Sequence, residues 1–141
     1  MWRSHLDKLR LLKVYSELVY CRIPPIPLKD KSTDITLACE VLEHLPKEAG
    51  FRFLAELERV TKELIIVSVP LNVPQEEIYG NPYEKHVSEW LPRDFVQHGY
   101  EIKVVHTLTK TLRIVDRIRR FVFKLPPTVT KLIVARKLLR P

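Results

Sequence analysis

The sequence predicts an α/β fold with a mostly parallel sheet, and residues 34–70 carry the observations that predict it. Two apolar runs, Ile35 to Cys39 and Leu64 to Val69, do not alternate with polar residues, which is typical of parallel strands covered on both faces. The segment between them has apolar residues at helical spacing, namely Phe51, Leu54, Leu57 and Val60. A strand, a helix and a second strand within about 35 residues predict a right-handed crossover unit.

The segment before this unit is predicted to form a helix and a short strand. Apolar residues at spacings of three and four give one face of a helix over residues 2–12. Tyr15 to Cys21 is predicted as a strand, which ends before the proline-rich stretch 23–27 because proline cannot donate to a ladder.

The segment after the unit begins with residues 71–90, a long polar and aromatic connection of the kind that often acts as a lid or binding loop. A short helix over residues 91–98 and a strand over residues 100–106 follow. Residues 108–122 have the apolar spacing of an amphipathic helix, and residues 129–137 are predicted as the closing strand.

Length and composition predict a single domain. A chain of 141 residues can bury a core, and 45% hydrophobic with 29% charged residues is typical of globular proteins. No apolar run reaches the roughly 18 residues that span a bilayer, and the N-terminus lacks a signal-peptide core, so we expect a cytoplasmic protein. Cys21 and Cys39 are expected to be buried, reduced thiols. The domain, residues 1–141, divides into an N-terminal helix and strand, the central unit, a lid-like loop, and C-terminal strands with a basic helix: 1–33, 34–70, 71–90 and 91–141.

The net charge of +7 is concentrated at the C-terminus. Residues 107–141 contain ten Lys or Arg with Asp116 as the sole acid, whereas the first 106 residues have a net charge of −2. Five cations recur at spacings of three and four and share one stripe of the predicted helix. Such a stripe attracts phosphates or anionic lipid head groups, and a solvated helix face is the alternative. The predicted phosphate-binding residues are Lys110, Arg113, Arg117, Arg120 and Lys124.

Several stretches of this sequence resemble one family. D-I-x-L-A-C-E-V-L-E-H-L, followed by a helix and by I-I-V-S-V-P, is similar to the second half of class I S-adenosylmethionine-dependent methyltransferases of type 11. The likeness covers roughly residues 18–105 and continues through Asn72, Gly80 to Tyr83, His86, Trp90 and Gly99-Tyr100. The resemblance implies a methyltransferase-like function with S-adenosylmethionine as cofactor, and it leaves the methyl acceptor open.

The resemblance also implies a Rossmann-like sheet of seven strands, with an antiparallel last strand, helices on both faces and a glycine-rich loop after the first strand. On that plan this chain supplies strands three to seven, so we expect an incomplete domain. The three glycines form no GxGxG sequence. Arg22 stands where the family tends to place an acid near the adenine, and Arg22 cannot accept a hydrogen bond. The predicted cofactor-binding residues are those of the loop after the first apolar run: Glu40, Val41 and Leu45.

Acidic and imidazole side chains gather at the end of that run. Glu40, Glu43 and His44 follow the carboxyl end of a predicted strand, where α/β sheets bind ligands, and the lid-like loop contributes His86. We predict Glu43, His44 and His86 as catalytic residues, with His86 as a general base or as a residue that positions the acceptor. Alternatively, His86 and Trp90 anchor the loop against the next helix. We expect no metal, although the oxygen and imidazole atoms of this set, Glu40 included, could hold a divalent cation.

Two classes of function follow from these observations. The first is an S-adenosylmethionine-dependent methyltransferase-like protein, incomplete as a stand-alone enzyme, that acts on RNA or another anionic acceptor. The second is a non-enzymatic partner subunit or nucleic-acid-binding module derived from a methyltransferase. In both cases the apolar strand near Ile35 would lie at an open sheet edge or pair directly with the strand near Leu18. An open apolar edge invites pairing with another chain, so we expect a homodimer or a complementing subunit.

Overall fold

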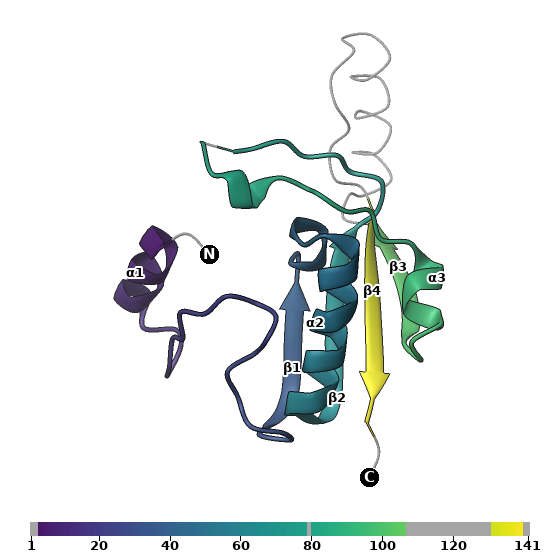
Figure 1. The fold of residues 1–141 in the computed structure, drawn as a ribbon, viewed down its shortest axis with the longest axis horizontal. Coiled ribbons are helices and arrows are strands. Elements are labelled where there is room, and N and C mark those ends of the chain that lie inside the picture. The colour runs from purple at the N-terminus through teal and green to yellow at the C-terminus, as the bar shows by residue number, and fades with distance from the viewer. Residues whose placement is uncertain (1–2, 79, 107–130, 140–141) are drawn as a thin grey trace, which may run out of the picture.

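The computed structural model describes residues 3–78, 80–106 and 131–139. Its helices are α1 (Arg3–Leu12), α2 (Lys47–Val60) and α3 (Pro92–Val96), with short 3-10 helices η1 (Leu42–His44) and η2 (Pro82–Glu84). Its strands are β1 (Thr33–Cys39), β2 (Thr61–Pro70), β3 (Glu101–His106) and β4 (Lys131–Leu138) (Figure 1). The amphipathic helix predicted from residue 108 onward and the five cations from Lys110 to Lys124 lie outside the described residues. None of the described helices is long and apolar enough to cross a membrane.

The described strands form one sheet in the order β1-β2-β4-β3. β1 and β2 are parallel, and β4 runs antiparallel to both β2 and β3. The sheet is therefore parallel except for its C-terminal strand, and the predicted α/β fold class is confirmed. Because β1 and β2 run the same way, their carboxyl ends share one edge, from which the loop of residues 71–90 extends toward α1 (Figure 1).

The hydrophobic core lies between the sheet and α2. The apolar face of this helix contributes Phe53, Leu54, Leu57 and Val60, which are at most 5% exposed. The sheet contributes side chains that are fully buried: Ile65, Val67, Val69, Ile133 and Ala135. Full burial of one such large side chain contributes about 1.5–3 kcal/mol, so this face sets the position of α2 on the sheet.

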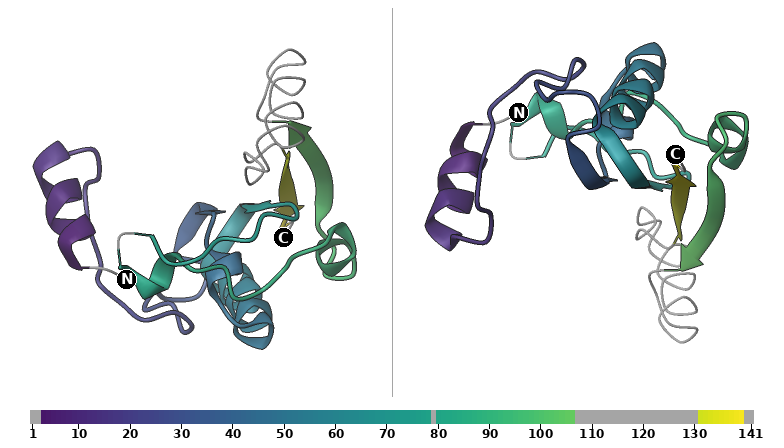
Figure 2. Two further views of the ribbon diagram at one scale, coloured as in Figure 1. Left: turned by 90° about the horizontal axis from the view of Figure 1, so that it is seen from above. Right: turned by 90° about the horizontal axis from the view of Figure 1, so that it is seen from below.

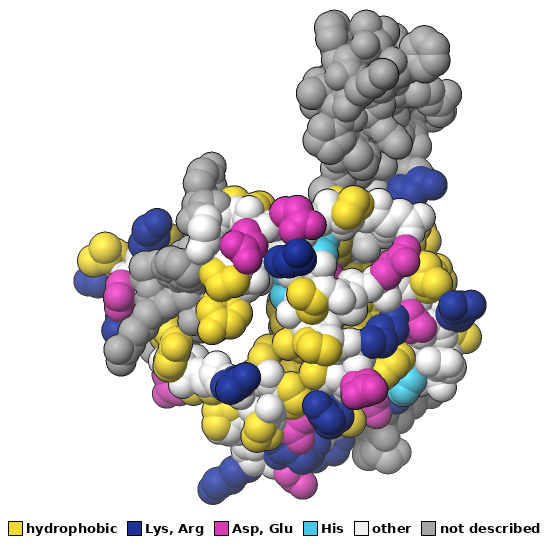
Figure 3. Space-filling view, turned by 45° about the horizontal axis from the view of Figure 1, so that its top comes forward, with side chains coloured by type: hydrophobic (Ala, Val, Ile, Leu, Met, Phe, Trp, Pro, Cys, Tyr) yellow, Lys and Arg dark blue, Asp and Glu magenta, His cyan; other side chains and the backbone are white. Residues whose placement is uncertain are grey.

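In the described part of the chain, helices cover one face of the sheet. α3 contributes Phe95 to the same hydrophobic cluster as α2, and Figure 2 shows how these helices lie relative to the strands. On the opposite face, Ile35 and Leu37 of β1 are 55% and 65% exposed. β1 is also an edge strand of the described sheet. Hydrophobic side chains border a hollow between the N-terminal part of the chain and the rest of the molecule (Figure 3).

The strand predicted at Tyr15 to Cys21 is absent, and this prediction is wrong. All residues between α1 and β1 lie outside helices and strands. The segment is held instead by Ile23 and Ile26, which pack against the core, and by a 2.8 Å hydrogen bond from the Ile26 N–H to the Glu56 carboxylate. Because this segment pairs with no strand of the sheet, its apolar residues form no ladder.

The two thiols and the ends of α2 also differ from prediction. Cys21 is half-buried and Cys39 is exposed, so the prediction of buried thiols is wrong, although both are free. Cys39 shares the uncovered face of β1 because side chains alternate along a strand. α2 already begins at Lys47, four residues before Phe51, the first residue of the apolar helical spacing. β2 begins directly at Thr61, whose hydroxyl donates to the Leu57 carbonyl at 2.6 Å.

Candidate active site at the carboxyl edge of the sheet

The end of β1 places the predicted acidic residues beside the long loop. Glu40 follows β1 with a φ of 54°, a left-handed conformation that turns the chain sharply. The 3-10 helix η1 begins two residues later, and Glu43 and His44 are its last two residues. This turn therefore presents their side chains at the edge of the sheet where α/β folds bind ligands.

Glu43 is buried, and its carboxylate has no hydrogen-bond partner among the residues that the structure describes. The residue is 3% exposed, and neither Oε1 nor Oε2 is hydrogen-bonded to any described residue. Burial raises the pKa of Glu43 from 4.5 to about 7, and the Glu40 carboxylate adds a smaller increase. Because a buried carboxylate without partners is costly, such a group is more typical of a functional site than of a structural one.

Two imidazole rings lie beside this carboxylate. The ring centroids of His44 and His86 are 5.0 Å apart, and the rings meet edge to face. His44 Nδ1 is 3.1 Å from the carbonyl oxygen of Lys85, and His86 Nδ1 is 2.6 Å from that of Val73. Because a carbonyl oxygen only accepts, both Nδ1 atoms donate, and Nε2 of each neutral ring keeps its lone pair. His44 Nε2 is 4.0 Å from Glu43 Oε1.

The long loop is bonded directly to the turn that carries Glu43. The N–H groups of Val87 and Ser88 both donate to the Glu43 carbonyl oxygen, at 2.8 and 3.1 Å. Ser88 Oγ donates to a carbonyl oxygen of η1 at 3.2 Å and accepts from Nε1 of the buried Trp90 at 3.0 Å. These bonds fix His86 relative to Glu43. Ser88 is not among the residues predicted from the sequence, because a single serine in a loop gives no recognisable signal.

A pocket of about 430 Å³ opens beside this cluster. Its size lies within the range of about 300–1,000 Å³ that is usual for small-molecule sites. Apolar and polar groups from both segments line it, among them Glu43, Pro70, Asn72, Val73, His86 and Ser88. The pocket thus combines apolar walls with one buried carboxylate and one oriented imidazole, which suits a small ligand or one group of a larger ligand.

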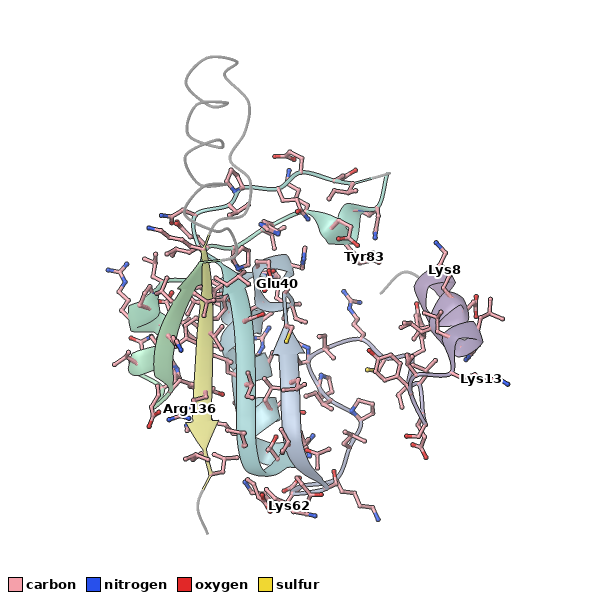
Figure 4. All side chains as sticks on the ribbon, turned by 180° about the vertical axis from the view of Figure 1, so that it is seen from behind. Lys8, Lys13, Glu40, Lys62, Tyr83 and Arg136 are labelled. Carbon is pink, nitrogen blue, oxygen red and sulfur yellow. The ribbon has the colours of Figure 1, made fainter. Side chains whose placement is uncertain are left out.

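Of the other predicted site residues, those that the structure describes lie outside the cluster. Glu40 is exposed, and its carboxylate accepts a 2.6 Å hydrogen bond from Ser68 Oγ. Figure 4 shows Glu40 at the end of β1 and Tyr83 in the loop beyond that edge. Val41 and Leu45 are half-buried against the hydrophobic core. The structure therefore brings the three predicted catalytic residues together and leaves Glu40 outside the group.

Comparison with known proteins gives one family-model match and several similar structures. Residues 3–65 match the family model described as a methyltransferase domain. A crystal structure of a SAM-dependent methyltransferase from Aquifex aeolicus is similar over 93% of this chain and 60% of that chain, at 18% identity and a TM-score of 0.54. Another from Archaeoglobus fulgidus is similar over 78% of this chain and 62% of that chain, at 17% identity and a TM-score of 0.45. No curated protein matches significantly.

These findings confirm the predicted resemblance to class I S-adenosylmethionine-dependent methyltransferases. Both similar structures are described as SAM-dependent, the cofactor that the sequence resemblance implies. This chain spans about three fifths of the length of the two similar structures (60% and 62%). At such low identity, the Aquifex aeolicus structure establishes a shared fold and leaves the acceptor open.

The described residues do not by themselves fit the whole cofactor. Gly50 packs against the Trp90 ring, Gly80 lies in the long loop with a φ of 69°, and Gly99 follows α3 with a φ of 78°. In the described residues, none of these glycines follows a strand, where the backbone could approach a nucleotide closely. The described sheet also has no strand beyond β1. Cofactor contacts at Glu40, Val41 and Leu45 therefore stay a prediction.

Proposed function

We propose that this is a methyltransferase-like protein whose described residues supply the acceptor side of a methyl-transfer site. The observation that supports this most strongly is the buried carboxylate of Glu43, which has no hydrogen-bond partner among the described residues and lies beside two oriented imidazoles. The cluster borders a pocket at the carboxyl edge of parallel strands, the usual ligand site of α/β sheets. S-adenosylmethionine supplies the methyl group when it is bound.

In this proposal Glu43, His44 and His86 bind and orient the acceptor. The cluster offers only electron-pair donors, namely two imidazole Nε2 atoms and one carboxylate. Such a set can receive the proton of a hydroxyl or amine directly, or it can hold the acceptor atom through a cation. Methyl transfer needs little else from the protein, because holding the two reactants in line supplies most of the rate enhancement.

We further propose that these 141 residues bind the cofactor weakly on their own and act together with additional structure. The described residues form no glycine-rich cradle for the nucleotide. The edge of β1, where such a cradle would attach in a larger sheet, carries the exposed side chains of Ile35 and Leu37. Additional strands from another polypeptide, or from further chain, would cover this edge.

The alternative proposal is a non-enzymatic partner subunit or nucleic-acid-binding module. The open edge of β1 favours this alternative, because an uncovered apolar edge strand invites pairing with another chain. The cation stripe from Lys110 to Lys124 favours RNA or another anionic partner on the basis of sequence. In this alternative the Glu43 cluster serves recognition rather than catalysis.

Cofactor binding and methyl transfer by the purified chain test the proposal. Calorimetric titration with S-adenosylmethionine is expected to show weak binding. At high cofactor concentration, radiolabel should pass to total RNA or to a panel of small hydroxyl and amine acceptors. Glu43→Gln and His86→Gln should each reduce this transfer by about a hundredfold. His98→Gln, a change outside the cluster, should leave the transfer unchanged.

Each outcome separates the two proposals. Tight cofactor binding with rapid transfer by the chain alone would contradict the proposed incompleteness. No transfer at any cofactor concentration, together with RNA binding or association with a partner, would favour the non-enzymatic alternative.

A further inference from the structure

Glu43, His44 and His86 bring three potential metal ligands to one place from two separate segments. Each residue offers one ligand atom, and all three atoms lie within 4.8 Å of one another. Glu43 is 3% exposed, and both of its carboxylate oxygens lack hydrogen-bond partners among the described residues. A carboxylate that is buried so completely is normally satisfied by hydrogen bonds or by a cation.

We propose that Glu43, His44 and His86 bind one divalent transition-metal ion, which keeps an open coordination position toward the adjacent pocket. The ion neutralises the buried carboxylate and occupies the space between the three ligand atoms. Glu40 is not a ligand, because its carboxylate is exposed and hydrogen-bonded to Ser68.

The orientation of both histidines is that of metal ligands. A metal-bound imidazole usually donates its other ring N–H to a carbonyl or carboxylate oxygen, which fixes the ring and leaves one nitrogen to coordinate. His44 and His86 both make this bond through Nδ1, to the carbonyl oxygens of Lys85 and Val73. Both Nε2 atoms are therefore the coordinating atoms.

The set of ligands selects the class of ion. Mg²⁺ and Ca²⁺ prefer oxygen ligands, whereas two imidazoles with one carboxylate favour Zn²⁺, Co²⁺, Mn²⁺ or Fe²⁺. Three protein ligands are also the number found in catalytic zinc sites, where water or substrate takes the fourth position. Because Glu43 and His86 line the pocket, the fourth position lies where the proposed function places the acceptor.

This inference rests on the proposed function only for what the ion does, because binding is measured without cofactor or acceptor. A chain that binds the ion and transfers no methyl group would retain the metal site and remove the proposed methyl transfer. A chain that transfers methyl groups without binding the ion would remove the metal site alone.

Metal titration of the full 141-residue chain tests the site. The chain is stripped with a chelator and titrated with Zn²⁺ by calorimetry and with Co²⁺ by visible absorption. We expect one ion per chain, a Co²⁺ spectrum typical of four or five ligands, and no comparable binding of Mg²⁺. Glu43→Gln and His86→Gln should each lower the affinity for Zn²⁺ at least about tenfold.

His98→Gln is the matched control. His98 Nδ1 also bonds to a carbonyl oxygen, that of Asp94 at 2.9 Å, but its ring stacks on Phe51 and it belongs to no group of described ligands. Its replacement should leave the affinity unchanged. The site is disproved if the folded wild-type chain binds neither Zn²⁺ nor Co²⁺. It is also disproved if the Glu43→Gln and His86→Gln variants both bind these ions as tightly as the wild-type chain does. Circular dichroism checks the fold of each variant, and Glu43→Gln decides the matter if His86→Gln does not fold.

Discussion

Glu43 and Glu56 show how surroundings change the same chemical group. Glu43 is buried with no hydrogen-bond partner in the described part of the chain, and burial raises its pKa to about 7. Glu56 receives hydrogen bonds from the Arg59 side chain and from the Ile26 N–H, and its pKa falls to about 2. The Glu43 carboxylate is therefore available to a ligand. The Glu56 carboxylate is not, because its hydrogen bonds hold the N-terminal segment against α2.

Because of Glu56, the thermal stability of the protein should fall as the pH is lowered. Its folded pKa, about 2, lies below the usual 4.5, so the unfolded chain takes up the proton first as the pH falls. Its contribution is therefore complete above pH 4.5 and is lost progressively toward pH 2. In thermal melts followed by circular dichroism, Glu56→Gln should weaken the decline in Tm over this range. Glu48→Gln, an exposed position on the same helix, should keep the wild-type decline, and identical curves for both variants would contradict the prediction.

At the scale of elements, α2 and the long loop meet at Gly50 and Trp90. A Cβ atom at Gly50 would collide with the Trp90 ring, which is 1% exposed. The ring also contacts Phe51, with centroids 5.1 Å apart, and Lys47 Nζ lies 4.0 Å from its centroid. This contact holds the far end of the loop, so it supports the position of His86 in the site.

Gly50→Ala should destabilise the protein even though alanine favours helices. The better helix propensity contributes about 1 kcal/mol, whereas displacing a buried ring costs about 1–3 kcal/mol. We expect a net loss of up to about 2 kcal/mol in the free energy of unfolding measured with urea. The loss should shrink in a Trp90→Phe background, where the smaller ring leaves room for the methyl group. A gain in stability on Gly50→Ala alone would show that the contact is not tight.

At the scale of the whole molecule, the sheet has a covered face and an open edge. In the described residues, β1 pairs only with β2, and its Ile35 and Leu37 side chains are exposed on the face opposite α2. Parallel strands are normally buried on both faces, so this edge is unusual for a finished sheet. It is the surface at which we expect a second copy or a complementing subunit to bind.

The open edge should make the purified chain self-associate at micromolar concentration. Leu37→Lys places a charge on that edge, the device by which natural edge strands avoid pairing, and should shift light scattering toward the monomer mass. Val96→Lys provides the control, because Val96 is similarly exposed, at 61%, but lies on α3. A monomeric wild-type chain would contradict this prediction, as would equal shifts in both variants.

Local patterns in the sequence were sufficient to predict the central unit and most of the strands. The apolar runs and the helical spacing between them correctly predicted β1, α2 and β2, because each pattern reflects the burial of its own segment. The same reasoning failed at Tyr15 to Cys21, which has the composition of a strand but no strand to pair with. It also failed for Cys39, because its exposure depends on what covers that face of β1.

The sequence by itself determined the fold class and placed Glu40, Glu43 and His44 at the end of a strand, since both follow from residues close together in the chain. Only the tertiary structure decided which of these residues act together. It places His86 beside Glu43, although the two residues are more than forty positions apart in the sequence. It also shows that Glu40 accepts a hydrogen bond from Ser68. It also buried the Glu43 carboxylate where no described residue forms a hydrogen bond with it. Burial and hydrogen bonding are set by neighbours in space, and a linear pattern reports only neighbours in sequence.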